Sequence, residues 1–397
     1  MDRKQLIDLF SEKILENLEF AQACRKTLHQ YPCISGEEAP TAQMISDFVP
    51  LAWTTVADVG LMGRVGPQTG QAIALRAELD ALPLQEQTGV PFASSNSAMH
   101  ACGHDVHQAA LIAVIRAARE IELPYGLVPI FQPREETYPS GALDIVNSGA
   151  LAEQQIEAIA AAHVHPSIAT GYVTTGKTPI NAAADEIRII VTGQGGHGAY
   201  PHQANNPLIV LANIASGINE MLTRTISPMH PVVFSVGALA GGEAANVIPD
   251  CGELRGTLRT MYTADREKAE EAITRFAESL GQAYGAQVAV EVINGEPVLD
   301  NNPQLVDSVD SYLSHLDIQI DEPLRSCGAD DFSFYSSEIP GIMAFVGVKN
   351  ASDLQETSLH QPQFLPDEDA VRRVALTLAA AYVGACDFID SAPTSQQ

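Results

Sequence analysis

The sequence predicts an α/β fold in which a larger domain, with a largely parallel central sheet flanked by helices, carries a smaller inserted α+β domain. Three observations support this expectation. Apolar strands alternate with helices between residues 72 and 166, which is typical of parallel sheets. A strand–helix–strand–strand–helix–strand pattern follows over 181–295. The chain has 397 residues, which is enough for about two domains.

Within the larger domain, turn residues delimit the expected elements. A charged amphipathic helix over 5–30 precedes Pro32, Gly36 and Pro40, which punctuate the chain. The elements expected next are a strand from 72 with a loop before Pro83, a helix over 105–120, a strand over 126–136 that stops at Pro133, and a strand over 156–166 that stops at Pro166.

The residues from 181 to 295 have the element order of a ferredoxin-like α+β domain. The segment DEIRIIVTG begins it as an alternating strand and runs into a Gly-rich turn. After residue 295, apolar strand and helix patterns return and complete the larger domain. We therefore assign residues 1–180 and 296–397 to the larger domain and residues 181–295 to the inserted one.

The composition excludes several classes of partner. A net charge of −27 opposes binding to nucleic acid or to an anionic membrane, because both require Lys and Arg against phosphate.

The sequence shows no export signal and no apolar run of ~20 residues, so we expect a cytoplasmic protein. The six cysteines are scattered along the chain, and we expect buried thiols rather than disulfides.

One short stretch, MHACGHDVH at 99–107, combines three histidines with a cysteine and an aspartate. Asp80, the Glu135–Glu136 pair and His163 each lie just past the C-terminal end of an expected strand. In open α/β sheets, ligands bind at the carboxyl ends of the strands. Four segments thus deliver polar groups to one edge of the sheet, and the sequence predicts a functional site there.

Thiolate, imidazole and carboxylate donors suit a borderline metal such as Zn²⁺ or Mn²⁺. Glu135 and Glu136 can point one carboxylate to metal and one to substrate, although a solvated acidic pair is the alternative. Side chains alternate along a strand, so at most one of His163 and His165 is a ligand. Two metals can bridge a water and polarise a carbonyl while a glutamate acts as general base, which is the chemistry of amide hydrolysis.

The chain resembles the metal-dependent N-acyl-amino-acid amidohydrolases over about residues 25 to 375. This group includes hippurate hydrolases, indole-3-acetyl-amino-acid hydrolases, aminoacylases and carboxypeptidases. The motifs that carry the resemblance occur in the family's order: LHQYPCISGEE, LRAELDALPLQE, MHACGHDVH, FQPREE, AHVHP, GGHGAYPH, NVIPD, GTLRT, DDFSFY and SLHQPQF.

The resemblance implies a catalytic larger domain with two divalent ions per subunit, Mn²⁺ or Zn²⁺, and a homodimer formed through the inserted domain. We expect the inserted domain to move as a lid. Position by position, the resemblance implies that Glu135 is the general acid and base. The implied metal ligands are Cys102, His104, Glu136, His163 and His360, and the implied substrate-binding residues are His197, Asn246 and Arg259.

Roles of different kinds are implied for the substrate-binding residues. His197 would stabilise the tetrahedral oxyanion, in the active site of the partner subunit. Asn246 would help to hold the substrate, and Arg259 would meet its carboxylate. Asp80 would orient a metal ligand or cap a turn. His100 and His107 are left as supporting or helix-start residues.

Three positions depart from the family pattern. A Gly-rich run after the paired glutamates is replaced by TYPSGA, which contains Tyr138 and Pro139 and crowds a loop beside the expected metals. His165 stands where the family often has an aromatic residue, and Asp330 replaces an expected glutamate. No expected ligand is lost, so we expect catalysis to be retained with an altered substrate preference.

Three further functions remain open on the sequence. A carboxypeptidase or dipeptidase that acts on small peptides with a free carboxylate uses the same chemistry and differs in pocket shape. An amidase with Cys102 as nucleophile and His104 or His107 as base would resist chelators and be sensitive to thiol alkylation. A non-catalytic metal-binding dimer would bind metal without turnover.

Overall fold

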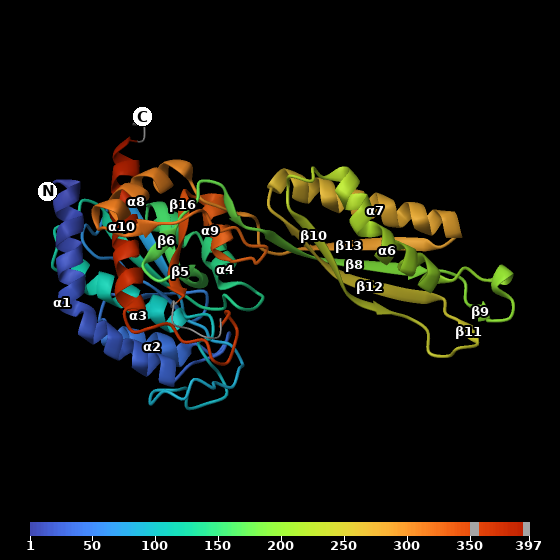
Figure 1. Cartoon of the computed structure of the whole chain (residues 1–397), viewed down its shortest axis with the longest axis horizontal. Helices are drawn as coiled ribbons and strands as arrows, with labels where there is room; N and C mark the ends of the chain where they lie inside the picture. Colours follow the sequence, from blue (N-terminus) through green and yellow to red (C-terminus); the bar gives the residue numbers. More distant parts are fainter. Residues whose placement is uncertain (350–356, 392–397) are drawn as a thin grey trace. The chain divides into compact units, whose positions relative to one another are not determined.

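The structure, a computed structural model, describes residues 1–349 and 357–391. The chain divides into two compact units (Figure 1). The larger unit comprises Met1–Thr178, Asp300–Leu324 and Asp331–Gln397, and the smaller unit comprises Pro179–Leu299 and Arg325–Asp330.

The segment 325–330, which the sequence assigned to the larger domain, belongs to the smaller unit. The Ser326 N–H donates to the Ile180 carbonyl over 2.8 Å, and the Ala182 N–H donates to the Ser326 carbonyl over 3.1 Å. Such pairing between residues far apart in the sequence is not visible in a periodicity pattern. The backbone hydrogen bonds therefore correct the assignment of this short segment.

The larger unit is built on an eight-stranded sheet in the order β1-β2-β4-β3-β5-β16-β6-β15. Its four central strands, β4, β3, β5 and β16, are parallel. Every residue of β3 and β4 is buried, as expected of a sheet covered on both faces. The strands are β1 Thr54–Val56, β2 Gly60–Met62, β3 Ala72–Glu78, β4 Gly126–Gln132, β5 Ile156–Ala169, β6 Tyr172–Thr174, β15 Gln319–Ile320 and β16 Gly341–Lys349.

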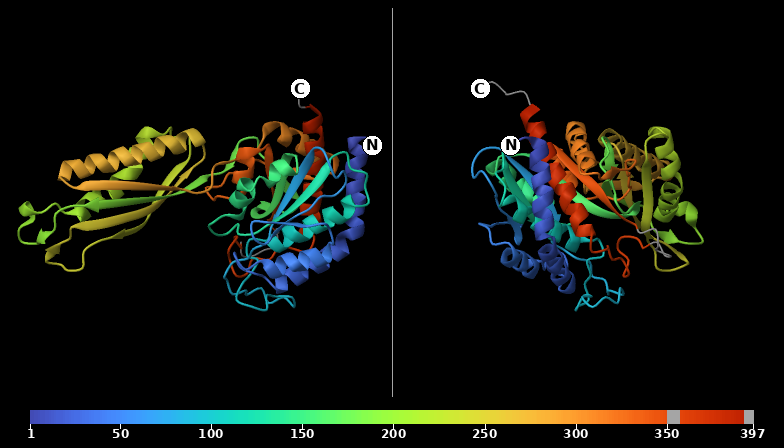
Figure 2. Two further views of the ribbon diagram at one scale, coloured as in Figure 1. Left: turned by 180° about the vertical axis from the view of Figure 1, so that it is seen from behind. Right: turned by 60° about the vertical axis from the view of Figure 1, so that its left-hand side comes forward.

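Helices cover both faces of this sheet (Figures 1 and 2). On one face, α1, α3, α8 and α10 pack against one another, and α3 and α10 contact the strands. On the other face, α9 contacts β5 and β16, and α4 packs against α9. The helices are α1 Arg3–Gln30, α2 Ala39–Phe48, α3 His104–Ala118, α4 Gly141–Asn147, α5 Ala150–Glu153, α8 Pro303–His315, α9 Phe332–Glu338 and α10 Ala370–Ser391.

The C-terminal helix α10 is long and apolar enough to cross a membrane by length and composition. Within the fold, however, 78% of its most apolar window is buried. Figure 2 shows it beside α1, which it contacts. Its apolar residues are therefore explained by packing between α1, α3, α8 and the sheet.

The smaller unit has a four-stranded antiparallel sheet in the order β10-β12-β8-β13. This order and the chain sequence β8-α6-β10-β12-α7-β13 define a ferredoxin-like fold. Alternate residues of β8 join a core with α6 and α7. The elements are β7 Pro179–Asn181, β8 Ala183–Thr192, β9 Gly196–His197, η1 Pro201–Gln203, α6 Pro207–Thr225, β10 Val232–Ala240, β11 Val247–Ile248, β12 Cys251–Thr260, α7 Thr263–Tyr284, β13 Gln287–Asn294 and β14 Leu299–Asp300.

One strand boundary differs from that expected. β4 ends at Gln132, directly before Pro133 as expected, and both paired glutamates lie in the loop after it. β5 continues through Pro166 to Ala169. Its pairing with β16 is irregular between Gly347 and Lys349, and an irregular ladder tolerates a proline that cannot donate a hydrogen bond.

A buried ionic network joins α1 to the start of α3. The Arg25 Nε donates to Asp105 Oδ2 over 2.9 Å, and Arg25 also donates to the carbonyls of Pro366 and Asp367. His29 lies between Asp105 Oδ2 and Glu86 Oε1, each 3.1 Å from a ring nitrogen. Although burial alone would raise it, Arg25 and His29 hold the pKa of Asp105 well below its usual range. The network orients the first turn of α3.

We predict that Asp105→Asn lowers the free energy of unfolding at pH 7 by about 3–5 kcal/mol, because Arg25 then remains buried without its partner charge. The folded-state pKa of Asp105 lies below its unfolded value of ~3.9. The stabilisation is therefore complete above that pH and is lost as the pH falls below it. Urea unfolding between pH 3 and 7 measures the effect.

Glu19→Gln is the matched control, since Glu19 lies on α1 with an exposed side chain. It should unfold like wild type at every pH. A difference between Asp105→Asn and wild type that stays constant down to pH 3 would contradict the ionic origin of the effect.

Candidate metal centre

The donors expected from the sequence converge at the carboxyl edge of the larger unit's sheet. Ligand atoms of Cys102, His104 and Glu136 all lie within 4.8 Å of one another. Cys102 Sγ is 3.4 Å from His163 Nε2, and His360 Nε2 is 3.2 Å from Glu136 Oε1. The five residues thus form one contiguous cluster, made by the loop before α3, the first residue of α3, the loop after β4, strand β5 and the loop before α10.

Glu135 lies at the side of this cluster. Its Oε2 is 3.8 Å from His104 Nε2, and its side chain is 12% exposed. The paired glutamates therefore do not form a solvated acidic pair. Both carboxylates, with side-chain exposures of 12% and 10%, lie at the donor cluster.

Backbone carbonyls determine which nitrogen of each buried imidazole faces the cluster. His104 Nδ1 donates to the Asp80 carbonyl over 2.8 Å, and His163 Nδ1 donates to the Val164 carbonyl over 2.7 Å. A neutral ring that donates through Nδ1 has its lone pair on Nε2. Both Nε2 atoms face the other donors, which is the arrangement that metal-binding histidines adopt.

A glycine allows the loop before α3 to approach β5 closely. Gly103 has a φ of +87°, and a Cβ there would collide with the Val164 side chain. Only glycine meets both demands without strain. The close approach brings Cys102 beside His163, which precedes Val164 on β5.

The cluster has an excess of negative charge and several buried polar atoms that the chain itself leaves without a hydrogen bond. Among the described residues, His104 Nε2, Glu136 Oε1 and Asp80 Oδ1 are buried without a hydrogen bond. Although burial alone would lower it, Glu78, Asp80 and Glu136 raise the pKa of His104 to about 10. Burial lowers the pKa of His163 well below its ordinary value, so that ring is neutral. Buried polar atoms without a hydrogen bond, in an electric field set by carboxylates that attracts positive charge, fit a site for a bound cation.

His107 lies beside this cluster, and both of its ring nitrogens form hydrogen bonds to neighbouring groups. Ligand atoms of Glu78, His104, His107 and His163 also lie within 4.8 Å of one another. The Val164 N–H donates to His107 Nε2 over 3.0 Å, while His107 Nδ1 donates to Glu78 Oε2 over 2.8 Å. Both of its nitrogens are therefore occupied, and the ring anchors β5 at the residue that follows His163.

Beneath His107, a fully buried arginine connects the site to the rest of the sheet. Arg76 forms ion pairs with Glu78 and with Asp331, and its Nε donates to Gln132 Oε1 over 2.9 Å. Asp331 also accepts from the Ser140 hydroxyl over 2.7 Å. Sequence reasoning gave Arg76 and Glu78 no role, although polar residues inside the apolar strand AIALRAE were a usable signal.

The three expected substrate-binding residues lie in the smaller unit. His197 in β9 pairs with Val247 of β11, and the Gly198 N–H donates to the Asn246 carbonyl over 2.8 Å. His197 and Asn246 therefore belong to one local structure. Arg259 lies on β12, where it pairs with Val233 of β10 and with Ala184 of β8.

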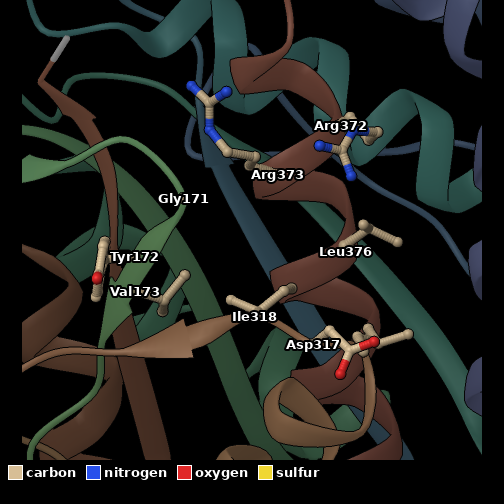
Figure 3. A pocket seen from close by; sticks show the side chains of 9 residues that line it. Gly171, Tyr172, Val173, Asp317, Ile318, Arg372, Arg373 and Leu376 are labelled. Atoms are coloured by element: carbon tan, nitrogen blue, oxygen red, sulfur yellow. The ribbon is translucent and has the colours of Figure 1, made fainter. Parts of the chain in front are cut away.

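The larger unit also contains a cavity of about 180 Å³ (Figure 3). The residues that line it come from the start of β6, the turn before β15 and the first part of α10. None of the donors described above is among them. Arg372, which lines the cavity, forms an ion pair with Asp369. Arg373, beside it, forms ion pairs with Asp367 and with Asp369. The cavity therefore plays no part in the metal centre.

Residues 74–382 match the peptidase family M20/M25/M40. The chain belongs to this family. It is a metal-dependent hydrolase of amide bonds, like the other M20 enzymes. The organisation of the larger unit and the donor cluster agree with this membership.

Two relatives match this chain over nearly its whole length. An N-acetylcysteine deacetylase of Bacillus subtilis is 32% identical, over 90% of this chain and 93% of its own. Thermostable carboxypeptidase 1 of Saccharolobus solfataricus is 32% identical, over 94% of this chain and 97% of its own. A solved structure of a dinuclear metal-binding M20 peptidase from B. subtilis matches with a TM-score of 0.79 and 28% identity, over 95% of this chain and 99% of that one.

We predict that His107→Phe weakens metal binding about 10- to 100-fold without changing the number of ions bound at saturation, because an orienting residue is lost and no ligand is. Isothermal titration of the metal-free protein with Mn²⁺ measures both quantities.

His165→Gln is the control for this prediction, because His165 lies on the same strand two residues from His163. Its affinity for Mn²⁺ should equal that of wild type. Loss of one bound ion in His107→Phe would show instead that His107 is a ligand.

Proposed function

We propose that this protein hydrolyses the amide bond of N-acyl amino acids, with two divalent metal ions at the donor cluster and Glu135 as general acid and base. The observation that carries the proposal is the convergence of five metal-type donor side chains beside the carboxylate of Glu135; two of the five, His104 and Glu136, have a buried polar atom without a hydrogen bond. The kinship with an N-acetylcysteine deacetylase supports the substrate class.

The residues that would hold the ions are Cys102, His104, Glu136, His163 and His360. When bound, the two ions lower the pKa of a water molecule and polarise the carbonyl of the scissile amide. A set of one thiolate, three imidazoles and one carboxylate suits Zn²⁺ or Mn²⁺. The kinship with a dinuclear metal-binding M20 peptidase supports a pair of ions.

Glu135 is suited to proton transfer because it lies at the edge of the cluster and is partly exposed. In the proposed reaction, its carboxylate takes a proton from the attacking water. The same proton then passes to the departing amine nitrogen as the C–N bond breaks. The products are a carboxylate and a free amino acid, so the reaction consumes one water and leaves Glu135 unchanged.

A carboxypeptidase acting on small peptides is the second candidate, favoured by the kinship with thermostable carboxypeptidase 1. Both activities use the same site and differ in the acyl group. A Cys102 nucleophile is disfavoured, because its sulfur lies among the metal-type donors His104 and Glu136 as well as beside His163. The presence of Glu135 beside the cluster disfavours a binding protein without turnover.

We also propose that the larger unit is catalytic and that the smaller unit forms a homodimer and acts as a lid, in a cytoplasmic enzyme. The exposed His197 in β9 would contribute to the partner subunit's active site as an oxyanion donor. Asn246 and Arg259 would hold the substrate and its carboxylate. The local pairing of His197 with the strand that follows Asn246 supports a joint role for these two.

We predict that Glu135→Gln lowers kcat for N-acetyl amino acids by about 10²- to 10⁴-fold while both metal ions remain bound, because the amide cannot transfer the proton. Glu136→Gln is the paired variant and should lose bound metal as well as activity. Steady-state kinetics with N-acetyl-L-cysteine and a dipeptide panel, combined with metal analysis, measure these effects. Chelation should abolish activity, and Mn²⁺ or Zn²⁺ should restore it.

Activity that survives chelation and is lost on alkylation of Cys102 would overturn the metallohydrolase proposal. Bound metal with no turnover across the panel would overturn the catalytic proposal. Turnover of dipeptides alone would establish the peptidase alternative.

For the dimer, we predict that mixing inactive Glu135→Gln with inactive His197→Ala restores about one quarter of wild-type activity, because a random mixture contains half heterodimers and each has one complete site. Activity is measured after unfolding and refolding the mixture together. No recovery, with heterodimers present by native mass spectrometry, would show that His197 does not act across subunits.

A further inference from the structure

The position of Glu135 depends on an unusual backbone conformation at the residue before it. Arg134 has a φ of +52°, in the left-handed region that residues other than glycine rarely adopt. Such a conformation costs about 1–3 kcal/mol and persists only where the surrounding structure imposes it. The contacts that hold Arg134 therefore also determine where Glu135 lies.

The side chain of Arg134 is held by the loops around it. Its guanidinium donates to Asp58 Oδ2 over 2.7 Å and to the Pro139 carbonyl over 3.0 Å, and it pairs with Asp144. These contacts fix the far end of a long, flexible side chain. They leave the peptide group between Pro133 and Arg134 to be held by something else.

That peptide group is held by a buried carboxylate from a distant segment. The Arg134 N–H donates to Glu38 Oε1 over 2.8 Å. Glu38 is fully buried and is the residue before α2, yet its side chain does not cap that helix. Burying a carboxylate is unfavourable unless it accepts hydrogen bonds, so this contact gives Glu38 a role that helix capping does not.

A second buried carboxylate holds the other side of Glu135. The Glu136 N–H donates to Asp80 Oδ2 over 2.9 Å, and the Ser35 hydroxyl donates to the same oxygen over 2.7 Å. Glu38 and Ser35 both come from the short segment between α1 and α2. The residue before Glu135 is thus held directly by this segment, and the residue after it is held by Asp80, which Ser35 of the same segment supports.

We propose that Glu38 is a positioning residue for the reaction: by accepting the Arg134 N–H, it maintains the left-handed turn that presents Glu135 to the substrate. This inference rests on the proposed role of Glu135. Since metal ligands come from other segments as well, loss of the contact displaces the proton-transfer group more than it disturbs metal or substrate binding. Displacement of a reacting group by about 1 Å can cost 10²-fold in rate.

The test compares three substitutions at residue 38 in the full-length, metal-loaded enzyme with N-acetyl-L-cysteine as substrate. Glu38→Ala removes the acceptor and should lower kcat about 10- to 100-fold, with KM within about twofold of wild type and both ions retained. Glu38→Gln keeps a carbonyl oxygen at the same reach and should restore kcat to within about threefold. Glu38→Asp replaces the alanine variant if that variant does not fold, because its shorter side chain withdraws the acceptor.

Glu37→Ala is the matched control, since the neighbouring Glu37 has the same charge and an exposed side chain. It should have the kcat of wild type. A wild-type kcat in the acceptor-deficient variant would overturn the inference, as would a loss of kcat that parallels loss of metal. Equal defects in Glu38→Gln and Glu38→Ala would also overturn it, because they would assign the effect to charge rather than to the hydrogen bond.

Failure of the proposed function gives a different result. In that case wild-type enzyme is inactive on the panel or Glu135→Gln remains active, whatever residue 38 is. Failure of the present inference alone leaves wild type active, Glu135→Gln inactive and Glu38→Ala unaffected.

Discussion

The parallel pairing of β4, β3, β5 and β16 is the constraint on which the rest of the site depends. Parallel strands end at one edge, so the loops that leave β3 and β4 and the far part of β5 come together there. Asp80, Glu136 and His163 are brought together in this way although 83 residues separate the first from the last. The apolar faces of these strands are buried by helices, which excludes water from the base of the site.

Burying so many charged groups at the site is unfavourable, and ion pairs with other buried residues compensate for it. Directly below the donors, Glu78 and Asp331 share the fully buried Arg76. Behind them, Asp105 is paired with Arg25 and His29. Hydrogen bonds to backbone groups, such as those from His104 and His163 to carbonyl oxygens, complete the arrangement without added charge. The remaining negative charge lies on the donor atoms themselves, where a cation is to bind.

Much of the fold was predictable, because it depends on local patterns. The alternation of strands and helices predicted the parallel sheet, and the order of elements from 181 to 295 predicted the ferredoxin-like fold. The errors were local as well. β5 continues through Pro166 because the ladder is irregular there, and segment 325–330 belongs to the smaller unit because of a backbone pairing with residues 180 and 182.

For the site, the sequence alone determined which side chains have metal chemistry and that they follow neighbouring strands, because residue type and strand order are local properties. Only the tertiary structure showed which residues hold these side chains in position. His107 is one of three histidines in a nine-residue run, and hydrogen bonds occupy both of its ring nitrogens, whereas His104 Nε2 has none. Glu38 lies 96 residues before Arg134, and no pattern joins them. Such contacts arise when distant segments pack together, and they depend on ångström-scale geometry that composition, periodicity and motif spacing do not encode.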